Sequence, residues 1–394
     1  MPNVESKKIL FCKKCVESNQ RYVGSIQHFD TKKSVRQTTT FDDGICGACK
    51  YFETKKRINW EEREKELIEI LNSHRKKNGD YDILIPGSGG KDSVYLSYIL
   101  KHKYKMNPLT VTWAPHIYTD IGWHNFKSWL KIGLDNELHT PNPRVHQKIT
   151  YLAFKNLLHP FQPFALGQHN LAPKLAVEKK IKLIIYGDAG FEKAVGGNVY
   201  GITGKKNKAL YTTNNEDIYF GGVHISELSK YNISKNDIKP YLPIRSELIE
   251  EFPLTVLNLP YYLNYNPQSN FYFASENSDF KVNPYRSEGT YTKYSSLDDK
   301  LDNLHFYTWF IKTGRGRATE DAALEVRNKI ITRDEAVKLV KKYDGEFPKK
   351  YFKEILEYLG INEKEFNKII DSFRPDHIWE KRSGKWQLKN AVWK

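Results

Sequence analysis

The fold of this chain is decided by the stretch Tyr81-Asp82-Ile83-Leu84-Ile85-Pro86-Gly87-Ser88-Gly89-Gly90-Lys91-Asp92-Ser93. Residues 83–85 form an apolar run of strand length, and the run stops at a Pro-Gly breaker. After the glycines, apolar residues return from Val94 onward at the spacing of a helix. The stretch therefore predicts a strand, a tight loop and a helix in succession.

The loop has the composition of an anion-binding turn. Glycines let a ligand approach the backbone closely, and a helix N-terminus presents unpaired N–H groups. Lys91 adds a mobile positive charge, while Ser88 and Ser93 add hydroxyl donors. The Walker pattern is not met, because Asp92 follows the lysine and Ile85 stands where its first glycine belongs. The predicted guest is a phosphate group.

The run Ser88-Gly89-Gly90-Lys91-Asp92-Ser93 closely resembles the motif of the PP-loop ATP pyrophosphatases. The resemblance implies that this loop binds the β,γ-pyrophosphate of ATP. It also implies that a substrate oxygen attacks the α-phosphorus, so that pyrophosphate leaves and an adenylylated intermediate forms. The alternative is an ordinary glycine-rich turn between a strand and a helix.

The chain contains four cysteines, which form two CxxC pairs. Cys12 and Cys15 are separated from Cys46 and Cys49 by a 30-residue spacer. This arrangement supplies four thiolates for a tetrahedral, structural zinc ion; a redox pair or two disulfides are the alternatives. If zinc takes all four, no thiol remains to carry persulfide sulfur or to hydrolyse glutamine.

Composition limits the classes of protein that fit. With 394 residues the chain is long enough for two or three domains, and its 28% charged residues suit a soluble enzyme. We find no apolar run of membrane-spanning length and no signal-peptide pattern, so we expect a cytoplasmic protein without a membrane partner. The net charge of +15 favours acidic partners, but it is spread along the chain, which suits ATP and acidic sugars as well as nucleic acid.

Strands and helices are expected to alternate around the loop. The expected elements are a capped helix at 60–71, strands at 109–113 and 181–186, helices at 121–134 and 172–180, and a third strand at 144–150 or 163–166. This alternation predicts an α/β fold with a doubly wound, mainly parallel sheet. Helices between residues 301 and 373 predict an α-helical C-terminal domain. We expect a zinc-ribbon module at 1–58, a PP-loop α/β domain at 59–250, and a substrate-side segment with the helical domain at 251–394.

Residues just after strand ends are the site candidates, because ligands bind beyond the carboxyl ends of parallel strands. The strand at 181–186 is followed by Gly187, Asp188 and Glu192. The carboxylates of Asp188 and Glu192, together with that of Asp92, are predicted to hold Mg²⁺ on ATP. In the alternative interpretation, Asp188 caps a helix and Glu192 lies in solvent.

Three further positions are candidates for ligand contact. Trp113 ends a strand and would stack on adenine, although a place in the core is the commoner fate of such an aromatic residue. Gln168 and Asn170 are expected to grip the substrate, while His169 between them is given no catalytic role.

A polar and aromatic block spans residues 288–302. Its hydroxyls and charges predict a pocket lining for a polyhydroxylated ligand, formed by Tyr291, Lys293, Tyr294, Asp298 and Asp299. The alternative is a capped helix entrance with acidic residues in its first turn. Farther on, Gly314-Arg315-Gly316-Arg317 is interpreted as a flexible connection between helices rather than a phosphate site.

Taken together, these motifs resemble the N-acetyl sugar amidotransferases of bacterial surface-polysaccharide and flagellar-glycan biosynthesis, and most closely their pseudaminic acid branch. The resemblance covers nearly the whole chain. One departure is Gly187-Asp188, where members often carry Gly-Glu. Besides the cysteine pairs, residues 88–93 and the block 288–302, the segments that carry it are 111–115, 187–192, 316–321 and 343–348.

The resemblance implies an ATP-dependent, AMP-forming amidotransferase in which Lys91, Asp92, Asp188 and Glu192 are catalytic. The N-acetyl carbonyl oxygen of an acetamido sugar would attack the α-phosphorus, and ammonia would displace AMP to leave an acetamidine. A separate glutaminase would supply the ammonia. The rival interpretation is a PP-loop enzyme that adenylylates a tRNA base, and a nucleotide-sensing scaffold without turnover is a third.

Overall fold

The computed structural model describes residues 8–20, 39–187, 203–206, 211–213 and 217–394. Its centre is a five-stranded sheet in the order β11-β6-β3-β4-β5, in which every neighbouring pair is parallel. The strands are β3 (Ile83–Pro86), β4 (Pro108–Trp113), β5 (Asp135–His139), β6 (Leu183–Tyr186) and β11 (Thr255–Asn258). The predicted doubly wound parallel sheet is therefore confirmed. The strand order reverses between β3 and β6, because β4 and β5 follow on one side of β3 while β6 and β11 lie on the other.

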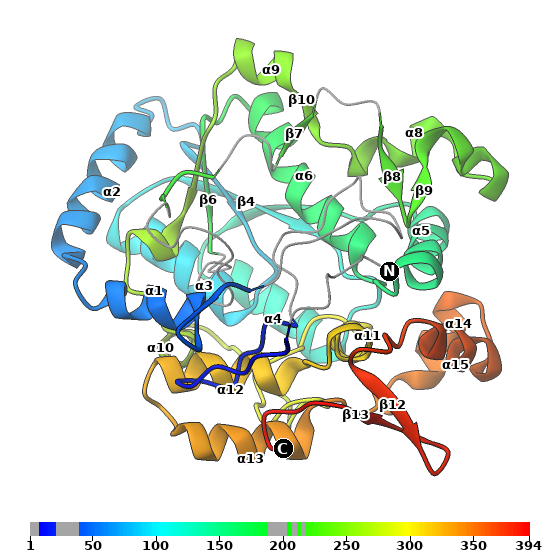
Figure 1. Cartoon of the computed structure of the whole chain (residues 1–394). Coiled ribbons are helices and arrows are strands. Elements are labelled where there is room, and N and C mark those ends of the chain that lie inside the picture. The colour runs from blue at the N-terminus through cyan, green and yellow to red at the C-terminus, as the bar shows by residue number, and fades with distance from the viewer. Residues whose placement is uncertain (1–7, 21–38, 188–202, 207–210, 214–216) are drawn as a thin grey trace.

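Helices lie on both faces of the sheet (Figure 1), and alternating side chains of its strands belong to two separate buried clusters. Ile83 and Ile85 pack with α2 (Trp60–His74) and α3 (Lys91–Tyr98), which continues into the π-helical turn Ile99–Lys103. Leu84 packs on the opposite face against α6 (Gln162–Glu178). A strand covered on both faces reads as a continuous apolar run, which is why β3 was recognisable in the sequence.

The third strand differs from the prediction. Both expected positions, 144–150 and 163–166, lie in helices, α5 (Pro143–Leu157) and α6. The Asn142 side chain accepts hydrogen bonds from the N–H groups of Arg144 and Val145, and Pro143 occupies the first turn, so the local sequence starts a helix. The true edge strand, β5, is polar and only partly buried, and therefore has no apolar run to reveal it.

The described residues between 205 and 283 complete the sheet and flank it. β11 forms the edge next to β6, although it lies past the boundary expected at residue 250. The helix α10 (Pro267–Asn277) packs beside α3 and α4 (Asp120–Leu130) through Ala274, and Phe280, which follows the helix, joins the same cluster. The smaller elements are β7 (Thr212–Thr213), β8 (Tyr219–Phe220), β9 (Val223–His224), the 3-10 turns Ile225–Tyr231, Lys239–Tyr241 and Leu259–Tyr261, α8 (Lys235–Ile238), β10 (Ile244–Arg245) and α9 (Ser246–Glu251).

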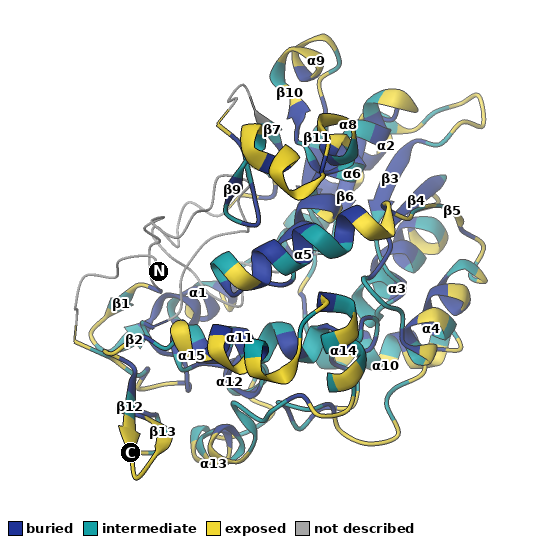
Figure 2. Cartoon of the chain, turned by 90° about the vertical axis from the view of Figure 1, so that its right-hand side faces the viewer, coloured by how far each residue is buried: buried dark blue, intermediate teal, exposed yellow. Residues whose placement is uncertain are grey.

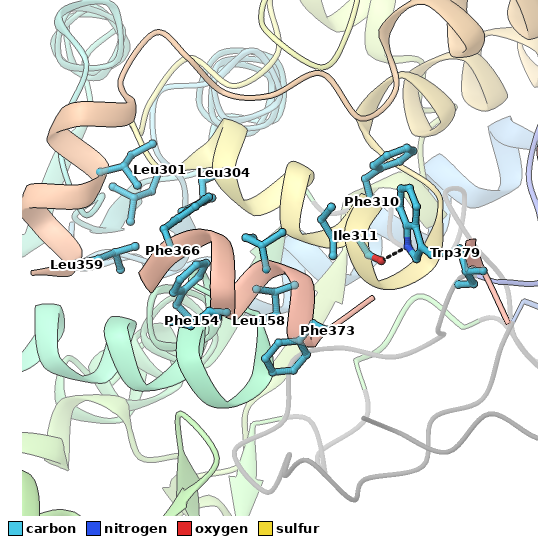
Figure 3. Close-up of a cluster of buried hydrophobic side chains, with 14 of the residues drawn as sticks. Phe154, Leu158, Leu301, Leu304, Phe310, Ile311, Leu359, Phe366, Phe373 and Trp379 are labelled. Atoms are coloured by element: carbon cyan, nitrogen blue, oxygen red, sulfur yellow. Dashed lines mark hydrogen bonds between the residues drawn. The ribbon is translucent and has the colours of Figure 1, made fainter. Parts of the chain in front are cut away.

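The C-terminal part is helical, as expected, and ends in a hairpin. Its elements are α11 (Asp302–Thr313), α12 (Arg317–Arg327), α13 (Arg333–Tyr343), α14 (Phe352–Leu359), α15 (Glu363–Ser372), β12 (Trp379–Arg382) and β13 (Lys385–Leu388). Figure 3 shows their shared core, in which Phe154 and Leu158 of α5 meet Phe366 of α15. Trp379 Nε1 donates a 2.7 Å hydrogen bond to the carbonyl of Ile311, which ties the hairpin to α11 (Figure 3). The helical part thus packs directly on the sheet domain.

The cysteine pairs lie against the C-terminal helices rather than in a separate module. β1 (Phe41–Asp42), β2 (Ile45–Cys46) and α1 (Gly47–Lys55) follow the first pair. The four cysteines pack with Ala322 and Ala323 of α12 and with Ala336 and Val340 of α13.

Exposure varies strongly across the fold. In Figure 2 the strands β3 and β4 are almost wholly buried, whereas the hairpin β12–β13 is mostly exposed. Among the described residues, no helix has the length and apolar character needed to cross a membrane.

A chain of aromatic rings joins the sheet domain to α11. His116, which follows β4, contacts Phe161 with tilted rings, and Phe161 stacks with His305, each pair at 4.9 Å between ring centroids. Burial lowers the pKa of His305 to about 3, assisted by the positive charges of Lys312 and Arg317. His305 is therefore neutral in the folded protein above about pH 4.

Acidification should consequently weaken this junction. Between about pH 6.5, ordinary for a histidine of the unfolded chain, and about pH 3, only the unfolded state binds the proton, which removes about 1.4 kcal/mol of stability per pH unit. From pH 6.5 to 5, the free energy of unfolding of the wild type should fall about 2 kcal/mol more than that of His305→Asn. Urea unfolding of both proteins at the two pH values measures this difference. Equal losses would show that His305 takes up its proton in the folded state.

Candidate functional site

The loop between β3 and α3 lies at the carboxyl end of the central strand, where the sheet order reverses. Gly90 is the N-cap of α3, and Lys91 is the first residue of the helix. The Ser88 N–H donates to Ser93 Oγ at 3.1 Å, which closes the loop. Lys91 Nζ lies 2.8 Å from Asp92 Oδ2, so its side chain is directed toward the Asp92 carboxylate. The loop predicted from the sequence is thus formed, with its amide groups at the start of a helix.

Two glycines in this loop have different roles. Gly89 has a φ of +88°, and a Cβ there would lie 2.7 Å from Phe126 Cα and 2.8 Å from the carbonyl oxygen of Asn125. Both contacts are with the backbone of α4, which has no room to move aside. Gly90 has an ordinary φ of −66°, and a Cβ there would meet only Ser88 Oγ at 3.7 Å. Of these two glycines, only Gly89 is therefore required by the fold.

This contrast gives a matched pair of variants. Gly89→Ala should lower the free energy of unfolding by at least about 2 kcal/mol, because it combines a left-handed backbone with a steric clash. Gly90→Ala should change it by less than about 1 kcal/mol. Thermal or urea unfolding measures both. Equal effects would mean that the loop adopts another conformation.

A cleft of about 490 Å³ opens beside the loop, within the size range of small-molecule sites. It brings together predicted residues from the loop, from β4, from α6 and from the end of β6. Its lining includes Gly87, Ser88, Asp92, Ser93, Val111, Trp113, Gln168, His169, Leu171, Tyr186, Gly187, Lys206, Asp298 and Arg317. The carboxyl edge of the sheet is therefore the candidate ligand site.

Trp113 forms a wall of this cleft but is packed more tightly than stacking on adenine would require. It is 2% exposed, and its ring stacks on His139 at 4.7 Å between centroids. On α6, Gly167 allows the close approach, since a Cβ there would lie 2.1 Å from the Trp113 ring. The expected adenine contact stays a prediction.

Asp298 is the residue of the 288–302 block that reaches the loop. The Ser88 side chain hydrogen-bonds to its carboxylate, and Lys91 lies close enough to stabilise the negative charge. Burial nevertheless dominates and raises the pKa of Asp298. The Asp298 backbone lies against Gly122 of α4, where a Cβ would approach Asp298 Cα to 2.6 Å. A carboxyl group is thus held at the phosphate loop from a segment about 200 residues away in sequence.

A second cavity, of about 140 Å³, lies on the other side of Lys91 and Asp92. Tyr294 lines it, with its ring 5.7 Å from Lys91 Nζ and its hydroxyl donating to Gln268. The remaining lining residues include Tyr265, Pro267, Ser295, Arg317, Glu320, Asp321, Leu324, Glu325, Asn328 and Ile330. The two cavities share Asp92 and Arg317, so these residues stand at the junction between them.

Arg317 is a site residue that the sequence interpretation missed. It pairs with Asp321 at 3.1 Å and lies over the ring of Phe306. Burial opposes its charge, but the carboxylates of Asp321, Glu320 and Asp302 outweigh that effect and raise its pKa. The signal was present as Gly314-Arg315-Gly316-Arg317, which was interpreted as a helix connection. Arg317 is therefore a permanently charged group facing both cavities.

Asn270 was also missed, because nothing in its local sequence distinguishes it. Its Nδ2 donates a 2.8 Å hydrogen bond to Asp92 Oδ1, and it is 4% exposed. Together with Lys91, it holds the Asp92 carboxylate at the edge of the cleft.

Several predicted residues lie elsewhere. Asn170 is buried on α6 and donates to the carbonyl of Tyr241, because the segment is a helix rather than the end of a strand. The Asp299 carboxylate accepts hydrogen bonds from the backbone N–H and the ring of His116, so it holds His116 in place instead of facing a cavity. Tyr291 donates to Glu325, behind the second cavity, and Lys293 is exposed. Asp188 and Glu192 lie outside the described residues.

The four cysteines form the predicted metal-binding geometry. Their sulfur atoms all lie within 4.8 Å of one another, with 3.8 Å between Cys12 and Cys49 and 3.7 Å between Cys15 and Cys46. A tetrahedron with metal–sulfur bonds of about 2.3 Å has edges of about 3.8 Å. A cluster of several irons would hold the sulfurs farther apart, so the spacing fits one zinc-sized ion. The N–H groups of Lys14, Cys15 and Cys46 point at Cys12 Sγ and would stabilise a thiolate.

Comparison with known proteins identifies the C-terminal part. Residues 288–392 match a sequence family described as LPS biosynthesis protein WbpG-like, C-terminal domain. An uncharacterized protein of Methanocaldococcus jannaschii is 47% identical over 53 residues, which is 14% of this chain and 19% of that protein. The matched family segment includes the 288–302 block, Arg317 and the helices that pack on the cysteines.

Two solved structures share limited overall similarity. One is a predicted subunit of a tRNA methyltransferase from M. jannaschii, with 13% identity and a TM-score of 0.25 over 49% of this chain and 75% of that chain. The other is the U34-tRNA thiolase NcsA from Methanococcus maripaludis with its 4Fe-4S cluster, with 15% identity and a TM-score of 0.30 over 85% of this chain and 89% of that chain. Similarity at this level does not bear on what the present chain binds.

Proposed function

We propose that this protein is an ATP-dependent, AMP-forming amidotransferase that converts the acetamido group of a sugar into an acetamidino group. One observation carries the proposal: the Ser88–Ser93 loop, with Lys91 and Asp92, opens into two adjoining cavities at the carboxyl edge of a parallel sheet. The family match of residues 288–392 supports a substrate from surface-polysaccharide biosynthesis. A sugar of the pseudaminic or legionaminic type, or an O-antigen sugar, would suit it.

The larger cleft has the volume and lining for ATP. The N–H groups at the start of α3 would hold the β- and γ-phosphates, with Lys91 reaching them from the adjoining cavity, and Arg317 would also contact the phosphate chain. The adenine would lie toward Val111, Leu171 and Tyr186, the apolar end of the cleft. Asp92, with Asp188 and Glu192, supplies carboxylate oxygens of the kind Mg²⁺ prefers, and the ion would offset the charge of the phosphates.

The smaller cavity suits the reacting end of the sugar. Its lining includes hydroxyl, amide and carboxylate groups that would orient sugar hydroxyls, and these belong to Tyr294, Ser295, Gln268 and Asp321. Its junction with the nucleotide cleft at Asp92 and Arg317 would bring the N-acetyl carbonyl oxygen to the α-phosphorus. Gln168, on the rim of the larger cleft, would contact the remainder of the substrate.

The chemistry follows from this arrangement in two steps. The carbonyl oxygen forms a bond to the α-phosphorus as the bond to the pyrophosphate oxygen breaks, which gives an O-adenylyl imidate. Lys91 and the loop amides stabilise the negative charge that develops on pyrophosphate. Ammonia then adds to the imidate carbon, AMP leaves with the former carbonyl oxygen, and the excess proton passes to solvent. The product is an acetamidine.

Ammonia must come from outside the chain. All four cysteines lie in the metal-binding cluster, so the chain has no thiol available to hydrolyse glutamine. A separate glutaminase is therefore the expected partner, and ammonium salts should replace it in vitro.

The test is to incubate the protein with ATP, isotopically labelled ammonium and a panel of free and nucleotide-linked acetamido sugars. The expected result is sugar-dependent release of AMP and pyrophosphate, with a product in which one oxygen is replaced by a labelled NH group. Purified tRNA in place of the sugar is the control arm. Accumulation of ADP, or turnover that requires tRNA and ignores every sugar, would contradict the proposal.

A further inference from the structure

A buried ion pair connects the cysteine cluster to the loop that carries Arg317. Arg315 is 1% exposed and Glu17 is fully buried. Arg315 Nε and Nη2 donate to the two carboxylate oxygens of Glu17 at 2.7 and 3.0 Å. This two-pronged geometry fixes distance and direction together, as a single surface ion pair does not.

Glu17 is held by the cysteine cluster itself. Its carbonyl accepts a 2.8 Å hydrogen bond from the Cys12 N–H, and its own N–H points at Cys15 Sγ at 3.4 Å. The position of its carboxylate therefore depends on the folded knuckle formed by Cys12 and Cys15. Any ion bound by the four thiolates would fix that knuckle in place.

At the other end, Arg315 stands two residues before Arg317. The intervening Gly316 N–H donates to Asp344 Oδ2 at 2.9 Å, and the Thr319 N–H donates to Asp344 Oδ1 at 3.1 Å. Arg315 and Asp344 thus hold the start of α12 from two sides, which determines where the Arg317 guanidinium enters the junction of the two cavities.

From this geometry we infer that Glu17 and Arg315 are positioning residues for Arg317, so that the cysteine cluster supports phosphate binding at the nucleotide site. The inference rests on the proposed function for the ligand of Arg317. Removing the Glu17 carboxylate leaves Arg315 with only its longer, 3.5 Å contact to Glu320, so the buried guanidinium loses its two-pronged partner and the segment would shift. A purely structural pair would instead lower stability without selecting among ligands.

The experiment compares Glu17→Gln with Glu53→Gln in the full chain. Glu53 pairs with Lys14 beside the same knuckle but is exposed and lies outside both cavities, so it is a matched control. Calorimetric titration should show that Glu17→Gln weakens pyrophosphate binding by about tenfold, about 1.4 kcal/mol, while adenosine binding changes by less than about twofold. The metal content should not change, because Glu17 is not a ligand. Glu53→Gln should resemble the wild type.

Combining variants separates positioning from other effects. Arg317→Ala should weaken pyrophosphate binding at least as much as Glu17→Gln, and the double variant should show no further loss, because both act through one guanidinium. Arg315→Lys, which keeps the charge but not the fork, should change binding in the same direction if Glu17→Gln proves too unstable to purify. Additive losses, equal losses for adenosine and pyrophosphate, or unchanged pyrophosphate affinity would overturn the inference.

A second readout is independent of the proposed reaction. Hydrogen exchange of residues 315–321 should be faster in Glu17→Gln than in the wild type, while that of residues 83–98 stays unchanged. If the wild type binds neither pyrophosphate nor ATP, the proposed function fails, yet this comparison still decides the link between Glu17 and the Arg317 segment. Unchanged exchange at 315–321 would show that the link does not exist.

Discussion

Replacing Lys91 with alanine should slow pyrophosphate release by at least about 100-fold, because one preorganised charge on a departing oxyanion contributes about 3 kcal/mol. Lys91 is the first residue of α3 and lines the smaller cavity, and its ammonium group lies 2.8 Å from Asp92, which lines both cavities. The lost interaction develops with the charge on pyrophosphate, so turnover should fall more than ATP affinity. A coupled assay of pyrophosphate release under saturating ATP measures the effect.

The control for this variant is Lys131→Ala, at the exposed C-terminal end of α4. It removes one positive charge from the molecule without touching either cavity, and its turnover should match that of the wild type. Unfolding curves should show that Lys91→Ala remains folded. Full turnover in Lys91→Ala would remove the loop from catalysis and, with it, the proposed reaction.

The second large effect is expected at the cysteine cluster. The wild type is expected to hold about one zinc ion per chain, and Cys46→Ser should hold much less. The same substitution should lower the free energy of unfolding by more than about 4 kcal/mol. Cys46 is buried, and its N–H donates toward Cys12 Sγ, so it contributes both a ligand and a support. Because the cluster packs on α12 and α13, its loss should destabilise the C-terminal helices as well.

Metal analysis and thermal unfolding test this prediction. Thr54→Ala on the neighbouring α1 removes only a local bond to the carbonyl of Tyr51 and should leave the metal content unchanged. Iron with the absorbance of an iron–sulfur cluster, or a wild-type protein that is fully stable without metal, would refute the zinc assignment.

How far the sequence could predict the fold differs from strand to strand. β3, β4 and β6 are covered on both faces, so their apolar runs were visible in the sequence. β5 is an edge strand whose residues are polar apart from Leu138, and it has no apolar run because none of its residues is fully buried. The helices after residue 301 were recognisable because their caps are local, as in the capping box of Thr332 and Glu335.

By itself, the sequence determined the features whose partners lie within a few residues: the glycine-rich loop between β3 and α3, the two cysteine pairs and most helix starts. The tertiary structure alone decided which distant residues meet at the loop, including Asp298, Asn270 and Arg317. It also paired Glu17 with Arg315, 298 positions apart. The reason is physical, since hydrogen bonds within a turn depend on neighbouring residues, whereas these contacts exist only because the helices pack on the sheet and on the cysteine cluster.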